Sequence, residues 1–65
     1  LTMARRRKPA ERIRHRPHRH RWEVWRDGPQ GAEFVFSFRS QANATEFLAE
    51  RDPEVRRRIM LEDRL

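Results

Sequence analysis

Two segments of the chain alternate between apolar and polar residues, a pattern that favours half-buried strands. In the segment 20–26, Trp22 and Val24 share one face, and in the segment 33–39 three phenylalanines recur at every second position. The segment 27–31 between them reads Asp-Gly-Pro-Gln-Gly. It favours a turn, because glycine can adopt positive φ and proline fixes its own φ. The pattern therefore predicts a β-hairpin.

The register of this hairpin follows from its large apolar residues, because directly opposed residues point to the same face of a sheet. A slip by one residue would separate the Trp/Val pair from the Phe triplet and leave one set in water. The favoured register gathers all of them on one face, with these opposed pairs: Arg26 and Ala32, Val24 and Phe34, Trp22 and Phe36, His20 and Phe38. The other face then carries Arg21, Glu23, Trp25, Val35, Ser37 and Arg39.

Two helices are predicted after the hairpin. Ser40 is suited to cap a helix over residues 41–51, and Asp52 followed by Pro53 begins a second helix that runs to about Arg64. The first helix carries an apolar stripe suited to cover the hairpin: Ala44, Phe47 and Leu48. The second carries a wider apolar band, of which part is expected to cover the sheet and part to meet a second copy: Val55, Ile59, Leu61 and Leu65.

Charge divides the chain into two parts. The first 21 residues hold nine Arg and Lys against one acid, and the remaining 44 hold seven bases against nine acids, which gives +8 and −2. A basic segment without apolar periodicity cannot bury enough surface to offset the entropy lost on ordering. We therefore expect a flexible Arg-rich arm over 1–20 and a small ββα(α) domain over 21–65. The predicted fold class is α+β, a β-hairpin packed on C-terminal helices and preceded by a disordered basic arm.

Composition narrows the function classes. The chain has no Cys, which excludes disulfides and zinc-thiolate sites. No apolar run approaches the roughly 18 to 20 residues of a membrane span, and no hydrophobic stretch of a secretory signal follows the charged N-terminus. We expect a cytoplasmic protein with no membrane partner. The chain has no Tyr, no glycine-rich phosphate loop and no Ser/His/Asp arrangement. We therefore expect no enzyme, no catalytic residues and no cofactor.

Three histidines close together, at positions 15, 18 and 20, raise the question of a metal site. Five arginines between Arg12 and Arg21 oppose the approach of a cation, so we expect no metal there. The histidines would instead add positive charge below about pH 6.5 and tighten the binding of a polyanion.

The expected partner of the arm is nucleic acid, because phosphate neutralisation with counterion release is where a basic arm gains most free energy. Such an arm can lie along phosphates or enter a narrow minor groove, and it is equally suited to RNA. The arm residues assigned to this contact are Arg5, Arg6, Arg7, Lys8, Arg12, Arg14, Arg16 and Arg19.

A family resemblance is carried by three segments. These are the frame Trp22-x-Val24-x-x-Asp27-Gly28, the segment Phe38-Arg39-Ser40 and the helix end Phe47-Leu48-Ala49-Glu50. Together they resemble the arm-type, AP2-like DNA-binding domain at the N-terminus of many phage and transposon tyrosine recombinases, over roughly Arg21 to Arg51. The chain departs from the family pattern in its helix start, in a longer loop and in having no evident third strand.

This resemblance implies a small sheet that packs on one helix and lays its exposed face into the major groove of DNA. Carried over to this sequence, it implies base contacts by Arg21, Trp25, Ser37 and Arg39. The alternation selects the same residues, because they form one strip of polar, cationic or aromatic groups. The chain has no Tyr, so recombinase catalysis is not expected. The resemblance implies a detached DNA-binding module or an accessory protein of a mobile element such as a phage.

The sequence thus predicts a small basic protein with an accessory or regulatory role that binds nucleic acid. Duplex DNA is favoured over RNA, and a DNA-binding protein would be nucleoid-associated. Association with RNA or the ribosome is one alternative. A second alternative is a protein-interaction module, or a homodimer, that uses the apolar band of the last helix: Val55, Ile59, Leu61 and Leu65.

Overall fold

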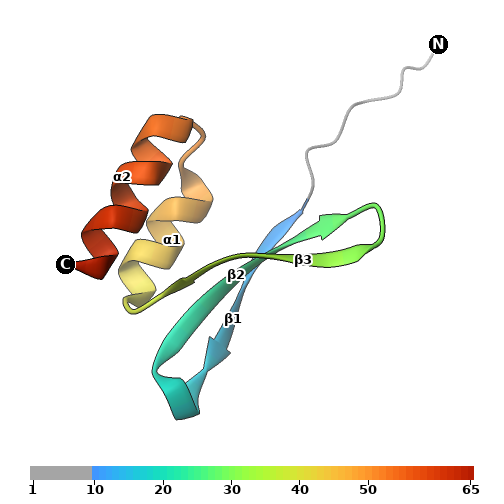
Figure 1. The fold of residues 1–65 in the computed structure, drawn as a ribbon, viewed down its shortest axis with the longest axis horizontal. Coiled ribbons are helices and arrows are strands. Elements are labelled where there is room, and N and C mark those ends of the chain that lie inside the picture. Colours follow the sequence, from blue (N-terminus) through green and yellow to red (C-terminus); the bar gives the residue numbers. More distant parts are fainter. Residues whose placement is uncertain (1–9) are drawn as a thin grey trace.

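The computed structural model describes residues 10–65, which form a three-stranded sheet followed by two helices (Figure 1). The elements are β1 (Glu11–Arg16), a 3-10 turn η1 (Pro17–Arg19), β2 (Arg21–Gly28), β3 (Gly31–Phe38), α1 (Gln41–Ala49) and α2 (Pro53–Arg64). The sheet is antiparallel in the order β1-β2-β3. The two helices lie side by side, and the turn between β2 and β3 extends away from them. The predicted α+β class, a hairpin packed on C-terminal helices, is confirmed.

The structure adds a strand that the sequence did not reveal. The prediction of an irregular arm is wrong for Glu11–Arg16, which forms β1 along β2 with Ile13 opposite Val24. Ile13 packs against the core. The surrounding charges do not prevent pairing, because β2 offers carboxylates to the arginines of β1. The first part of the predicted arm, with Arg5, Arg6, Arg7 and Lys8, lies outside the described residues.

The observed register of β2 and β3 differs from the predicted one by one residue beside the turn and by two residues nearer the helices. Trp22 lies opposite Phe38 and Val24 opposite Phe36. One residue of this shift comes from a tighter turn, in which Gly28 lies opposite Gly31, and the second comes from a bulge between Val24 and Trp25. Gly31 takes φ 121°, a conformation open to glycine but strained for other residues. A shift of two residues preserves the alternation, so the predicted sharing of faces holds for these four large residues.

His20 is not part of the hairpin ladder, contrary to the predicted register. It ends η1 in the left-handed region, at φ 53°, and its N–H donates to the Pro17 carbonyl at 3.2 Å. This turn reverses the chain between β1 and β2. His20, which was expected opposite Phe38, therefore belongs to the turn that connects β1 to β2.

A bulge inverts the alternation in the distal half of the hairpin. The register shifts between Val24 and Trp25, so that Trp25 lies opposite Phe34 and Val35 is the extra residue. The prediction that Phe34 joins the core is wrong, because its side chain is 53% exposed. The prediction that Val35 lies on the outer face is wrong as well, because Val35 packs against the core.

The core is small and lies between the helices and the adjoining part of the sheet. Ile13, Trp22, Phe36, Leu48 and Val55 are among the residues that pack around it. Both predicted helix caps are confirmed: the Ser40 side chain accepts from the Asn43 N–H, and the Asp52 side chain accepts from the Glu54 N–H. Among the described residues, the buried apolar side chains are Val24, Phe38, Ala44, Phe47 and Ile59.

The apolar band predicted on the second helix is divided between core and surface. Ile59 is buried at 3% exposure and Val55 packs beside it. Leu61 is 58% exposed and Leu65 is fully exposed. The four residues therefore do not form one continuous surface, because the helix turns Ile59 toward the sheet.

Asp63 joins the end of α2 to the start of α1. Its Oδ2 accepts from the Arg39 N–H at 2.8 Å, and its Oδ1 accepts from the Ser40 N–H at 3.2 Å and from Asn43 Nδ2 at 3.0 Å. The side chain is buried. A carboxylate at this position satisfies N–H groups that a helix start leaves unpaired, and it complements the positive end of the helix dipole.

Arg56 joins β1 to both helices. Its Nη1 and Nη2 donate to the two carboxylate oxygens of Glu11 at 3.0 and 2.5 Å, and its Nε donates to the Glu50 carbonyl at 2.8 Å. The guanidinium also lies 4.1 Å from the centroid of the Phe47 ring. The side chains of Arg56 and Glu11 are only 17% and 13% exposed. This two-pronged hydrogen bond lowers the pKa of Glu11 below its ordinary value of 4.5.

Two phenylalanines of β3 test the core assignment. Phe38→Ala should cost about 3 to 5 kcal/mol of unfolding free energy, because Phe38 is fully buried. Phe34→Ala should cost at most about 1 kcal/mol, because only its contact with Trp25 is lost. Thermal unfolding followed by far-ultraviolet circular dichroism measures both. Equal destabilisation by the two substitutions would contradict the placement of Phe34 outside the core.

The pair between Glu11 and Arg56 makes stability depend on pH. Because the pKa of Glu11 is lowered in the folded state, the stabilising effect of its charge is complete above about pH 5 and is lost as pH falls through the folded-state pKa. Glu11→Gln should cost about 1.5 to 3 kcal/mol at neutral pH and flatten the decline of stability as pH falls below about 5. Denaturant titrations at several pH values measure this. Glu46→Gln, which removes an exposed acid of α1, is the control and should leave the profile unchanged.

Candidate nucleic-acid interface

The face of the sheet opposite the helices, here called the outer face, collects side chains from all three strands. Directly opposed residues share a face. Arg14 lies opposite Glu23, which lies opposite Ser37, and Arg16 lies opposite Arg21. On the described residues the outer face consists of Arg12, Arg14 and Arg16 of β1, Arg21, Glu23, Trp25 and Asp27 of β2, and Phe34 and Ser37 of β3.

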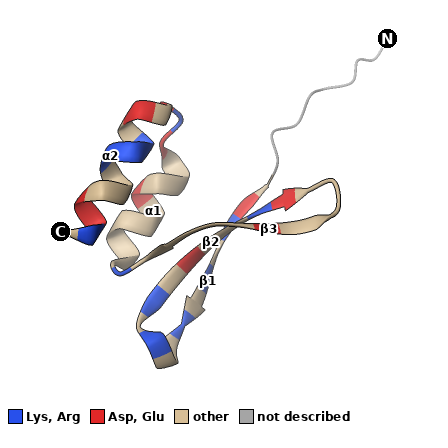
Figure 2. Ribbon diagram, in the orientation of Figure 1, with Lys and Arg blue, Asp and Glu red and all other residues tan. Residues whose placement is uncertain are grey.

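This arrangement unites two groups of residues that the sequence assigned to separate regions. Arg12, Arg14 and Arg16 were expected in a flexible arm, whereas Arg21 and Trp25 were expected on the sheet. Figure 2 shows basic residues, all of them arginines, along β1, η1 and the beginning of β2. Pairing of β1 with β2 thus converts three arm arginines into a row on a rigid surface.

Two carboxylates lie among these cations. Glu23 Oε1 accepts from Trp25 Nε1 at 3.0 Å and from Arg16 Nε at 3.1 Å. The hydrogen bond from Trp25, followed by that from Arg16, lowers the pKa of Glu23 below 4.5. Asp27 Oδ1 accepts from Arg12 Nη1 at 2.7 Å. The outer face therefore keeps an excess of positive charge, with four arginines against two carboxylates.

The aromatic part of the outer face was only partly predicted. Trp25 lies there as expected, but its indole N–H is already donated to Glu23, so only its ring surface is free for a ligand. Phe34 packs edge to face against Trp25, with ring centroids 5.5 Å apart. Sequence reasoning missed Phe34 because the bulge that turns it outward depends on contacts between strands. No local signal in the chain marks it.

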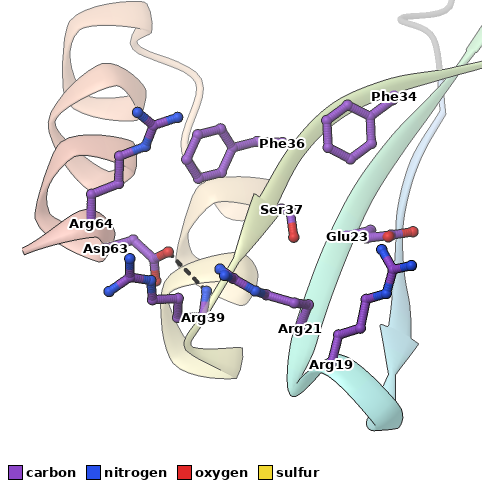
Figure 3. Close-up of a pocket in the computed structure, with 9 residues that line it drawn as sticks. All are labelled: Arg19, Arg21, Glu23, Phe34, Phe36, Ser37, Arg39, Asp63 and Arg64. Atoms are coloured by element: carbon purple, nitrogen blue, oxygen red, sulfur yellow. Dashed lines mark hydrogen bonds between the residues drawn. The ribbon is translucent and has the colours of Figure 1, made fainter.

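A hollow of about 800 Å³ adjoins the outer face at the β3 edge of the sheet (Figure 3). Arg39 lies here, directly after β3, so it is set apart from the strip of the sheet on which it was predicted. Arg19 of η1 lines the same hollow, as do Arg21, Glu23, Phe34, Phe36, Ser37, Asp63 and Arg64. Arg64 was not singled out in the sequence, where it only marked the end of the second predicted helix.

The histidines do not form a metal site among residues 10–65. No group of three or more His, Cys, Asp or Glu in this range is placed to hold an ion. His15 instead stacks on Trp22, with ring centroids 4.7 Å apart and planes at 6°. In the same part of the chain, no helix has the length and apolar character needed to cross a membrane.

Comparison of the chain with protein-family models, curated protein sequences and solved structures gives no match. The resemblance to the arm-type domains of recombinases therefore stays a prediction from the sequence.

Proposed function

We propose that the protein binds nucleic acid, with duplex DNA as the preferred form, through the outer face of its sheet. The observation that carries this proposal is the row of arginines from β1 beside Arg21 and Trp25, on a face that the helices leave uncovered. Arginine suits this role because its planar fork binds phosphate oxygens and the O6 and N7 atoms of guanine.

The dimensions of the row fit a duplex groove. Arg12, Arg14 and Arg16 occupy every second position of an extended strand, so the row spans about 13 Å. This length corresponds to about four base pairs along the helix axis. The major groove of DNA admits β-strands, whereas the major groove of A-form RNA is too deep and narrow for side chains to read. This difference favours duplex DNA over RNA.

The resemblance to the arm-type, AP2-like domains supports the same proposal. Those domains contact DNA with the exposed face of a small sheet, and β1 supplies the third strand that was not evident in the sequence. A role as a detached DNA-binding module or an accessory protein of a mobile element is the corresponding biological proposal.

The rival proposal, a protein-interaction module built on the last helix, has less support. Ile59 and Val55 are taken up by the protein's own core, and only Leu61 and Leu65 of the predicted band are exposed. Two exposed leucines on a charged helix form a small apolar surface, whereas interaction patches are large and contiguous.

The double substitution Arg12→Ala/Arg14→Ala tests the proposed face. Binding to a blunt duplex should weaken, and the slope of log K against log salt should fall in magnitude by about two, because two phosphate contacts are lost. Fluorescence anisotropy over a salt series measures both effects. The matched control is Arg57→Ala/Arg58→Ala, which removes two exposed arginines of α2. An equal loss in the control would show that only net charge matters, and would contradict the proposal.

Glu23→Gln tests the same face by a gain of affinity. The amide oxygen of glutamine can still accept from the Trp25 indole, but the negative charge beside Arg16 is removed. Affinity for duplex DNA should rise several-fold at low salt, and the salt slope should steepen by up to about one. The same titration with Glu46→Gln on α1 should show no change. Weaker binding by Glu23→Gln, with folding intact, would place the DNA elsewhere.

A further inference from the structure

The hollow beside β3 gathers cations from three different elements and from the loop that follows β3. Arg19 comes from η1, Arg21 from β2 and Arg64 from the last turn of α2, and Arg39 follows β3 directly. In Figure 3 the side chains of Arg21 and Arg39 extend into the space between the sheet and α2. Residues far apart in the sequence thus contribute positive charge to one concave surface.

None of these four arginines takes part in an ion pair with a residue of the described range, a property that they share with Arg14 and the other exposed arginines of α2. Within residues 10–65, the recorded ion pairs use Arg12, Arg16, Arg26 and Arg56, and none uses an arginine of the hollow. No carboxylate of the described residues is therefore in direct contact with their guanidinium groups. A cluster of guanidinium groups without carboxylate partners is typical of sites for phosphate.

The two carboxylates in the wall of the hollow are already engaged. Glu23 accepts from Trp25 and Arg16. Asp63 accepts from the backbone N–H groups of Arg39 and Ser40 and is buried. With four arginines and two carboxylates, the wall keeps a net charge of +2. An anion that enters the hollow finds arginine N–H donors without having to displace these carboxylates.

The opposite side of the hollow is aromatic. Phe34 is 53% exposed, an unusual position for a large apolar ring in so small a domain. The Arg64 guanidinium lies over the Phe36 ring, 5.2 Å from its centroid. Because this contact covers part of Phe36, the Phe34 ring offers the freer surface. An exposed aromatic ring beside arginines is a platform on which a nucleobase can stack.

We propose that this hollow binds one unpaired nucleotide of a DNA strand, with the phosphate among the arginines and the base against Phe34. A base inside a duplex is stacked on both faces and cannot offer a face to Phe34, so the nucleotide must lie at an overhang or in a single-stranded stretch. The hollow shares Arg21 and Glu23 with the outer face, so a strand can pass from one to the other. This inference rests on the proposed function.

The experiment compares one duplex in two forms, blunt and with a three-nucleotide single-stranded overhang. The full chain should bind the overhang form about tenfold more tightly at matched salt. Phe34→Ala should abolish this preference, so that the ratio of overhang to blunt affinity falls to about one, and Phe34→Trp should retain the preference. Circular dichroism confirms that each variant is folded. Arg39→Ala should also reduce the preference, because a phosphate contact is lost.

Two controls separate the sources of failure. Arg12→Ala/Arg14→Ala should weaken binding to both DNA forms by the same factor, because these residues do not line the hollow. Equal affinity of the full chain for blunt and overhang DNA would overturn the inference and leave the proposed function standing. No binding to either form would refute both. Binding of deoxyadenosine monophosphate as tightly as the overhang DNA would also overturn the inference, because the site would then be one for free nucleotides.

Discussion

The attachment of β1 depends on the contact between Arg56 and Glu11. Ile13 is the only apolar residue of this strand, and burying one isoleucine contributes about 1.5 to 3 kcal/mol. Ordering the backbone of six residues costs about 6 to 12 kcal/mol, so burial of Ile13 alone cannot hold the strand in place. The hydrogen bonds and side-chain contacts with β2, together with the buried two-pronged contact of Arg56, supply the rest. The same guanidinium packs on Phe47, so strand and helices are held by one side chain.

This attachment determines the charge pattern on the opposite side of the sheet. With β1 paired, its arginines stand in a fixed row beside Arg21 and Trp25. A ligand that binds such a preformed row does not have to order the segment first, so less free energy is lost on binding. Glu11, which contacts the helices, and the arginines that point outward occupy alternate positions of the same strand. Stability on one face and binding on the other are therefore coupled through a single element.

The sequence predicted the parts of the fold that local chemistry determines. Ser40 and Asp52 cap the helices as expected, because capping depends on neighbours two or three positions away. The register was wrong by one residue because the turn closes more tightly than predicted, and by a second residue because of the bulge between Val24 and Trp25. β1 was missed because one isoleucine among arginines gives no clear periodicity. Its stabilising partner, Arg56, lies 45 positions from Glu11, a separation at which sequence pattern carries no information.

The sequence identified most individual residues of the candidate site, but not the way in which they form one surface. Most of its arginines were identified from charge alone, whereas Phe34 required knowledge of the bulge, which depends on packing between strands. The placement of Asp63 could not be anticipated either. Its negative charge is met by three neutral N–H donors rather than by Arg39 or Arg64 side chains. A buried carboxylate satisfied in this way can join two helices while the guanidinium groups beside it stay available to an anion, which is why the hollow can be both structurally supported and positively charged.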